Sequence, residues 1–262
     1  MESTGGKDAA AAIPGPDAQP VAAPCEPDNV GIRQEMNALF GMLSHDLRTP
    51  LSAISGWLHL LETGKLDPAG QKRALAKIRS NVDGQVRLLD DALLLARSRS
   101  GALELALVLI PVAVPLAAAL QAIAPPAAEK GVALRSSGFS ATAHVLADPD
   151  LLRRSFEILL RRALDATDRG GTVDTRVQVV DSTIVIAIGD DGKGCTMAEL
   201  QTLRDSLARS GSAYAQALSR IERGMLLVQG LVEAHGGCTE AESDGPGQGM
   251  NIIVRLPRHG TN

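Results

Sequence analysis

Two apolar stripes near the N-terminus recur at spacings of three and four residues, and a short break separates them. The first stripe consists of Leu43, Leu47, Leu51, Ile54, Leu58 and Leu61. The second consists of Leu75, Ile78, Val82, Val86, Leu89, Leu93 and Ala96. This spacing places apolar side chains along one face of an α-helix. The pattern therefore predicts two successive amphipathic helices.

The break between the stripes contains an end signal and a start signal. Gly64 can cap the C-terminus of a helix. Asp67 and Pro68 suit the N-cap and the first position of the next helix. Two long helices with a short connection form an antiparallel hairpin. A single hairpin leaves its apolar seam in water, whereas two copies can bury it in a four-helix bundle, so we expect a homodimer.

The chain on either side of this hairpin has a different character. Residues 1–31 are rich in Ala and Pro, so they are expected to form a disordered tail. Residues 32–102 form the predicted hairpin, 103–258 a second domain, and 259–262 a short tail. The strands expected in that domain are Val132–Arg135, Thr172–Val180, Thr183–Ile188 and Asn251–Leu256. The expected helices are Val114–Glu129, Pro149–Ala166 and Met225–Ala234. This mixture predicts an α+β fold.

Composition excludes several classes of function. The net charge of −4 gives no reason to expect nucleic-acid binding. The three cysteines, Cys25, Cys195 and Cys238, form no CxxC pair, which argues against a disulfide framework or a zinc site. The apolar run Leu105–Leu120 is too short to span a bilayer and contains two prolines, so we interpret it as a buried strand followed by a helix start. A cytoplasmic protein is expected.

One short string around a histidine points to chemistry. His45 follows the seam residue Leu43 by two positions, about 200° around the helix, so it should face solvent. An exposed imidazole can act as a nucleophile toward phosphorus, and Asp46 can orient the ring or accept its proton. Thr49 lies one turn on, where its hydroxyl could position a water.

The string Ser44-His45-Asp46-Leu47-Arg48-Thr49-Pro50-Leu51 resembles the phosphoacceptor box of sensor histidine kinases. The resemblance implies that His45 is phosphorylated and that Asp46 assists the transfer. It also implies that the acid and Thr49 support phosphatase activity. The partner it implies is the receiver domain of a response regulator, and a separate sensor protein is a further candidate partner, because the sequence contains no sensory domain.

The second domain contains a turn suited to a ligand. Asp190, Gly192 and Gly194 follow an apolar strand, and an Asp there can accept a hydrogen bond from an adenine amino group. The turn resembles the first glycine box of the ATP-binding domain that histidine kinases share with gyrases and Hsp90-like chaperones. This implies an α/β-sandwich ATP-binding domain of the Bergerat type, with Asp190 at the adenine.

The same domain departs from that family at its phosphate end. Ile158 and Arg162 stand where the family has two Asn residues, the second of which binds Mg²⁺. A guanidinium offers only donors, so Arg162 cannot ligate a cation but can contact phosphate. Of the second glycine loop, Gly224 is retained and Glu222 adds negative charge.

Three functions remain open on this evidence. The first is an ATP-dependent histidine kinase that phosphorylates His45 and passes the phosphate to a response regulator. The second is a degenerate relative that acts as a phosphotransfer protein or phosphatase through His45, Asp46 and Thr49. The third is an interaction module without phosphate chemistry, which the complete string around His45 disfavours.

Overall fold

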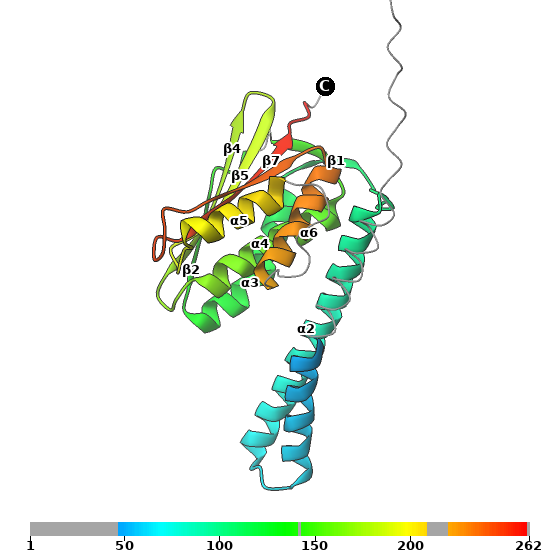
Figure 1. Ribbon diagram of the computed structural model, residues 1–262, viewed down its shortest axis with the longest axis vertical. Coiled ribbons are helices and arrows are strands. Elements are labelled where there is room, and N and C mark those ends of the chain that lie inside the picture. Colours follow the sequence, from blue (N-terminus) through cyan, green and yellow to red (C-terminus); the bar gives the residue numbers. More distant parts are fainter. Residues whose placement is uncertain (1–46, 141–142, 209–219, 261–262) are drawn as a thin grey trace, which may run out of the picture.

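The computed structural model describes residues 47–140, 143–208 and 220–260. A helical hairpin projects from a domain in which helices pack on a sheet (Figure 1). The α+β prediction, with a helical hairpin before a sheet-containing domain, is confirmed. The predicted tail at residues 1–31 and the start of the first helix lie outside the described residues.

The hairpin has the predicted helix ends. Its first helix is described over residues 47–62, and Gly64 follows with a positive φ of 66°. Helix α2 (Pro68–Arg99) begins at the N-cap Asp67, whose Oδ1 accepts a hydrogen bond of 2.7 Å from the backbone of Gly70. The two helices lie side by side where the described part of the first helix begins, because Gln85 Nε2 donates a hydrogen bond of 3.1 Å to the carbonyl of Leu47.

The predicted seam of the hairpin faces solvent over most of its length. Leu93 and Leu75 are each 59 % exposed. The other large exposed members of the seam are Leu51, Leu58, Val82, Val86 and Leu89. One hairpin therefore cannot bury its own apolar face, as expected from the sequence.

The main sheet of the second domain has five strands in the order β2-β4-β5-β7-β6. Strands β2 and β4 run parallel, and every other neighbouring pair is antiparallel. The strands are β2 (Ala133–Ser137), β4 (Thr172–Val180), β5 (Thr183–Asp190), β6 (Cys238–Glu242) and β7 (Met250–Pro257). A small antiparallel sheet pairs β1 (Val108–Pro111) with β3 (His144–Ala147).

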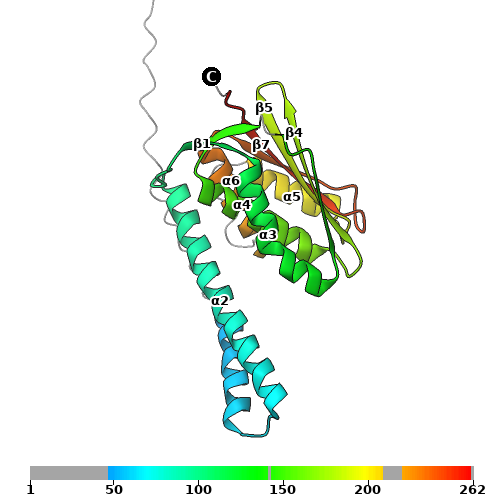
Figure 2. The ribbon, with the colours of Figure 1, turned by 180° about the vertical axis from the view of Figure 1, so that it is seen from behind.

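Helices cover one face of the main sheet (Figures 1 and 2). They are α3 (Ala113–Lys130), α4 (Pro149–Ala166), α5 (Met197–Ala208) and α6 (Arg220–Ala234). Buried side chains alternate along β7, from Met250 to Leu256, so one face of the strand packs against the helices. Helix α4 contributes Phe156, Leu159 and Leu160, each no more than 1 % exposed, to the same core. This core fixes α4 beside the end of β5.

The last turns of α2 dock on the second domain. Leu95 of α2 packs against Leu227 and Leu231 of α6 in a small apolar cluster. Beside it, Arg154 of α4 forms an ion pair of 2.6 Å with Asp91 of α2. The opposite end of the hairpin extends away from the domain (Figure 1).

Several elements differ from the sequence prediction. Helix α4 and strand β4 have the predicted bounds. The strand in the apolar run Leu105–Leu120 is not buried, because Val108 and Leu109 are 46 % and 45 % exposed on a two-stranded sheet. Strands β3 and β6 and helix α5 were not predicted. Among the described residues, no helix is both long and apolar enough to cross a bilayer.

Candidate functional site

The predicted phosphoacceptor residues fall partly outside the described chain. His45 and Asp46 lie outside the described residues. Thr49 is described, and its side chain is exposed on the first helix. An exposed hydroxyl at this position is compatible with the predicted contact to water or a phosphoryl group.

Helix α4, which carries Arg162, is held at its N-terminus by several hydrogen bonds. Asp148 is the N-cap, and its Oδ1 accepts hydrogen bonds of 3.0 and 3.2 Å from the backbones of Asp150 and Leu151. The backbone N–H of Asp148 donates to Nε2 of the buried His235 at 3.0 Å, and Nδ1 of His235 lies 2.6 Å from the carbonyl of Leu231. Both ring nitrogens are therefore engaged within the fold, which supports a structural role for His235.

The two polar residues predicted in the nucleotide pocket contact each other. Arg162 projects from α4 to the end of β5, where its Nη1 lies 3.1 Å from Asp190 Oδ2. The other carboxylate oxygen, Oδ1, accepts a hydrogen bond of 3.1 Å from the backbone of Gly192. The Arg162 side chain is 10 % exposed and that of Asp190 is 0 % exposed. Because the Asp190 side chain is completely covered, adenine cannot reach it in this arrangement unless a neighbouring group moves.

Burial dominates the electrostatics of this ion pair. Desolvation raises the pKa of the Asp190 carboxyl, and Arg162 and the Gly192 N–H partly oppose that rise. Desolvation also lowers the pKa of the Arg162 guanidinium, which Asp190 partly opposes. Arginine stays protonated even so. The pair is thus two charges held out of water, with Arg162 Nε buried and without an acceptor among the described residues.

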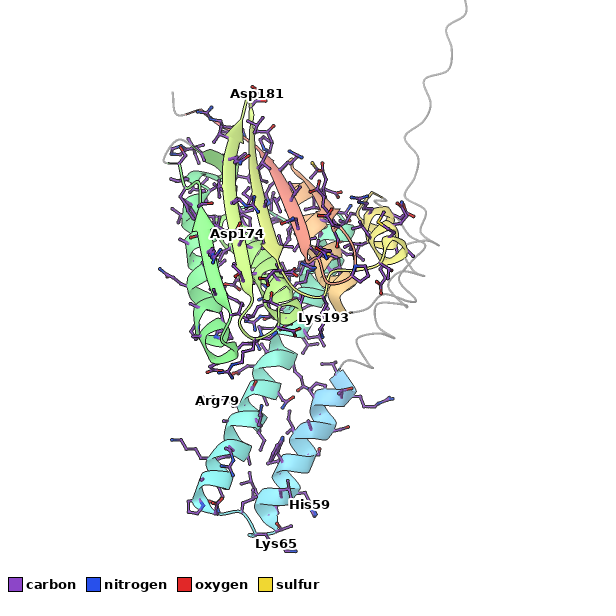
Figure 3. All side chains as sticks on the ribbon, turned by 90° about the vertical axis from the view of Figure 1, so that its left-hand side faces the viewer. His59, Lys65, Arg79, Asp174, Asp181 and Lys193 are labelled. Atoms are coloured by element: carbon purple, nitrogen blue, oxygen red, sulfur yellow. The ribbon has the colours of Figure 1, made fainter. Side chains whose placement is uncertain are left out.

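The two glycines of the turn are required by close packing. A Cβ on Gly192 would lie 2.2 Å from the carbonyl oxygen of Ala166, at the end of α4. Gly194 has a φ of 58°, and a Cβ there would lie 2.1 Å from the carbonyl oxygen of Gly245. The turn is therefore clamped between α4 and the loop before β7. Figure 3 shows Lys193, which lies in this turn, at the end of the sheet nearest the hairpin.

The remaining predicted phosphate residue lies in a helix. Gly224 belongs to α6, and a Cβ on it would lie 3.1 Å from Cγ2 of Ile158 on α4. Ile158 is the residue at the first of the two Asn positions, and it packs with the apolar core. The described backbone thus places Gly224 against an apolar neighbour, in a helix instead of in a loop.

The described residues do not fit a divalent cation at Arg162. No group of three or more His, Cys, Asp or Glu side chains gathers anywhere in the described ranges. Asp190 already uses one oxygen on a guanidinium and the other on a backbone N–H. A fixed positive charge beside the carboxylate also repels a cation. The chemistry of this donor set favours an anion.

Sequence reasoning missed the contact between α2 and the second domain. The Asp91–Arg154 pair joins residues that are far apart in the chain, so no local sequence pattern predicts it. A weak signal was present, because Leu94 and Leu95 lie off the predicted seam and mark a second apolar face on α2. That face is the one that docks on α6.

Two family models match the chain. Residues 35–101 match the His Kinase A (phospho-acceptor) domain. Residues 147–260 match the histidine kinase-, DNA gyrase B- and HSP90-like ATPase domain.

Curated relatives and a solved structure agree with these matches. The chain is 29 % identical over 218 residues to an uncharacterized sensor-like histidine kinase of Rhizobium meliloti, covering 82 % of this chain and 41 % of the relative. It is 29 % identical over 217 residues to the signal transduction histidine-protein kinase BaeS of Escherichia coli, covering 82 % and 45 %. Full-length ShkA in complex with AMPPNP has a TM-score of 0.59 at 25 % identity, covering 84 % of this chain and 46 % of that one.

The chain spans less than half the length of these curated relatives. Within that span it contains a phospho-acceptor domain followed by an ATPase-like domain, in that order. Together the two matches account for more than half of the chain, and the relatives are histidine kinases over the same region. The chain therefore belongs to the sensor histidine kinase family and contains the core of such a protein.

Proposed function

We propose that this chain acts in two-component signalling by transferring phosphate from ATP to His45 and then to an aspartate of a response-regulator receiver domain. The observation that carries the proposal is the docking of α2 on the ATPase-like domain, through Leu95 and the Asp91–Arg154 pair. This contact tethers a nucleotide domain to the phosphoacceptor hairpin. Phosphoryl transfer depends chiefly on positioning, so such a tether favours it.

The predicted residues of the phosphoacceptor string and of the turn after β5 have these roles in the reaction. The imidazole of His45 attacks the γ-phosphorus of ATP, ADP leaves, and Asp46 accepts the proton from the ring. Thr49 orients water when the phosphoryl group is removed from the regulator. Asp190 binds adenine once Arg162 releases it, with Gly192 and Gly194 shaping the turn. AMPPNP in the ShkA complex supports ATP as the nucleotide.

We infer that the working unit is a homodimer. The exposed seam, including Leu75 and Leu93 at 59 % exposure each, is a long apolar stripe at helical spacing. Monomeric proteins rarely leave such a contiguous apolar surface in water. A second copy of the same hairpin buries it in a four-helix bundle. The domain limits that we propose are 32–102 for the hairpin and 103–258 for the ATP-binding domain. We propose the cytoplasm as the compartment. A separate sensor protein is the proposed source of the signal.

The direct test is incubation of the full chain with Mg²⁺ and γ-labelled ATP. Acid-labile, alkali-stable label on the wild type, absent from His45→Ala, is the expected result. His59→Ala is the matched control, because His59 is an exposed histidine on the same hairpin (Figure 3) and should label normally. No label on a folded wild-type dimer, or label that persists in His45→Ala, would contradict the proposal.

A second function is favoured by one specific observation, the closed Arg162–Asp190 ion pair. If that pair never opens, the ATPase-like domain is a scaffold, and His45, Asp46 and Thr49 act only on phosphate supplied by a partner. Mixing the chain with a phosphorylated receiver domain in the absence of ATP tests this function. Loss of phosphate from the receiver, dependent on His45 or Thr49, would support it, and tight ATP binding would exclude the scaffold role.

A further inference from the structure

Arg162 occupies the position at which this family is expected to hold a divalent cation, and its positive charge is paired with one carboxylate, that of Asp190. The guanidinium is 10 % exposed and is anchored at one end by Asp190. A guanidinium has five N–H donors in a fixed fork. One donor reaches Asp190 Oδ2, while Nε is buried without an acceptor among the described residues. A buried donor without an acceptor is costly, so the fork is poised for a further anionic oxygen.

Adenine and Arg162 compete for the same carboxylate. The Asp190 side chain is 0 % exposed; its Oδ2 accepts a hydrogen bond from Arg162 and its Oδ1 accepts one from the Gly192 N–H. A carboxylate oxygen can accept more than one hydrogen bond, but the Asp190 side chain is 0 % exposed. An adenine amino group can therefore reach Asp190 only if a neighbouring group moves, and the group that moves in our proposal is Arg162. The released guanidinium then needs a new negative partner within reach. The phosphates of the same nucleotide supply one, and a guanidinium binds phosphate oxygens in bidentate fashion.

We propose that Arg162 takes the place of the divalent cation in this pocket, so that adenine nucleotide binds with its phosphates on the guanidinium and without a metal ion. The inference rests on the proposed binding of ATP to this domain. Binding proceeds by exchange, in which Asp190 passes from Arg162 to adenine and Arg162 passes from Asp190 to phosphate. Adenosine cannot complete this exchange, because it offers no anion to Arg162.

The test is calorimetric titration of the full chain with AMPPNP, ADP and adenosine, each in excess EDTA and in Mg²⁺. Wild type should bind both nucleotides equally well in the two buffers and should not bind adenosine. Arg162→Asn should lose at least about tenfold in affinity in EDTA, the size of one or two charge-assisted hydrogen bonds, and should become dependent on Mg²⁺. Arg153→Asn is the matched control, since it removes one positive charge from the same helix at a side chain that pairs with Glu157.

Two further results keep the test decisive. Arg162→Lys retains the charge, so it should keep metal-independent binding even if Arg162→Asn fails to fold. Wild-type binding that requires Mg²⁺ would overturn the inference and leave the proposed kinase function intact. Absence of AMPPNP and ADP binding in both buffers would overturn the inference together with ATP-dependent function. Tight binding of adenosine would overturn the exchange.

Discussion

The hairpin and the ATPase-like domain solve the burial of apolar surface in different ways. The domain encloses its own core, in which Phe156, Ile186 and Val254 are completely buried. The hairpin leaves large residues such as Leu75, Val86 and Leu93 in water. The hairpin is therefore incomplete as a monomer, whereas the domain is complete. Assembly is expected to act on the first region and ligand binding on the second.

The two regions also differ in how closely their functional residues follow the family. The phosphoacceptor string is intact, whereas the pocket helix α4 keeps its fold residues and changes its polar ones. Leu159, Leu160 and Ala163 are buried as the fold requires, while Ile158 and Arg162 stand where the family resemblance predicts nucleotide contacts. One helix thus preserves a core and alters a site, which shows that the two requirements are separable within a few residues.

The largest expected effect is the loss of the dimer when charge enters the seam. Leu93→Glu would place one carboxylate from each copy in the bundle interior, and an unpaired buried charge costs several kcal/mol. We expect the dissociation constant to rise by at least about 100-fold, since every 1.4 kcal/mol is about tenfold. Sedimentation across a range of concentrations measures this.

Met197→Glu is the matched control for that substitution. Met197 is 66 % exposed on α5, in the region that is complete by itself, so the dimer should persist. Equal dissociation of both variants would break the comparison, because it would place the interface on the domain as well as on the hairpin.

The next effect concerns the buried Arg162–Asp190 ion pair at the predicted nucleotide site. Asp190→Asn leaves the guanidinium of Arg162 buried without its counter-charge, and breaking a buried pair in this way costs about 3 kcal/mol of unfolding free energy. Asp174→Asn is the control on the same sheet, because the Asp174–Arg176 pair is 34 % and 58 % exposed and should contribute at most about 1 kcal/mol. Figure 3 shows Asp174 on the open face of the sheet.

Denaturant unfolding of both variants measures the difference between the two pairs. The double variant Arg162→Met/Asp190→Asn removes both charges and should recover most of the lost stability. If Asp190→Asn is as stable as Asp174→Asn, the pocket pair does not constrain the domain, and Arg162 moves freely.

The helix starts offer a smaller and closely matched comparison, because both regions use an Asp-Pro pair. Asp67 caps α2 through one hydrogen bond to Gly70. Asp148 caps α4 through two, and its Oδ2 also accepts a hydrogen bond of 3.1 Å from the backbone of Ala106. We expect Asp148→Ala to cost about 2 kcal/mol and Asp67→Ala about 1 kcal/mol. Thermal and denaturant unfolding would show equal losses if the extra contact of Asp148 contributed nothing.

The sequence predicted those features that have a local cause. Helix α4 and strand β4 have the bounds expected from their helical and strand-like sequence patterns, and the Asp67-Pro68 pair marks the start of α2. Strand β3 is short, and it pairs with β1, from which α3 and β2 separate it in the chain, so it has no local signature. Strand β6 is short and carries charged side chains at the sheet edge.

The pocket illustrates the same limit on a finer scale. The resemblance singled out Arg162 and Asp190 separately, as a phosphate contact and an adenine contact. Their ion pair joins residues that are 28 positions apart, and it depends on how α4 lies on β5. Sequence spacing cannot provide that packing. The roles of the two residues therefore stay predictions, whereas their mutual contact is visible only in the structure.

The smallest expected effect tests whether the two regions are coupled at all. Arg154 and Asp91 join α4 to α2 at 2.6 Å, with side chains 20 % and 31 % exposed. Burial raises the pKa of Asp91 despite the opposing effect of Arg154, so the carboxylate itself is held at some cost. Asp91→Asn alone should therefore lower the free energy of unfolding by less than the energy of the interaction between Asp91 and Arg154. A double-mutant cycle with Arg154→Gln isolates that interaction, which we expect to be about 0.5–1 kcal/mol.

The same cycle should be followed by the labelling of His45, because stability alone does not report the position of the domain. If docking of α2 on α4 and α6 helps to position the domain for transfer, the two single variants and the double variant should slow labelling by similar amounts. If instead the two single substitutions slow the labelling of His45 independently of each other, the contact does not position the domain. The ATPase-like domain would then act on the hairpin without this contact. Gln201→Ala is the control, because its bond to Asp205 lies within α5, away from the contact with α2.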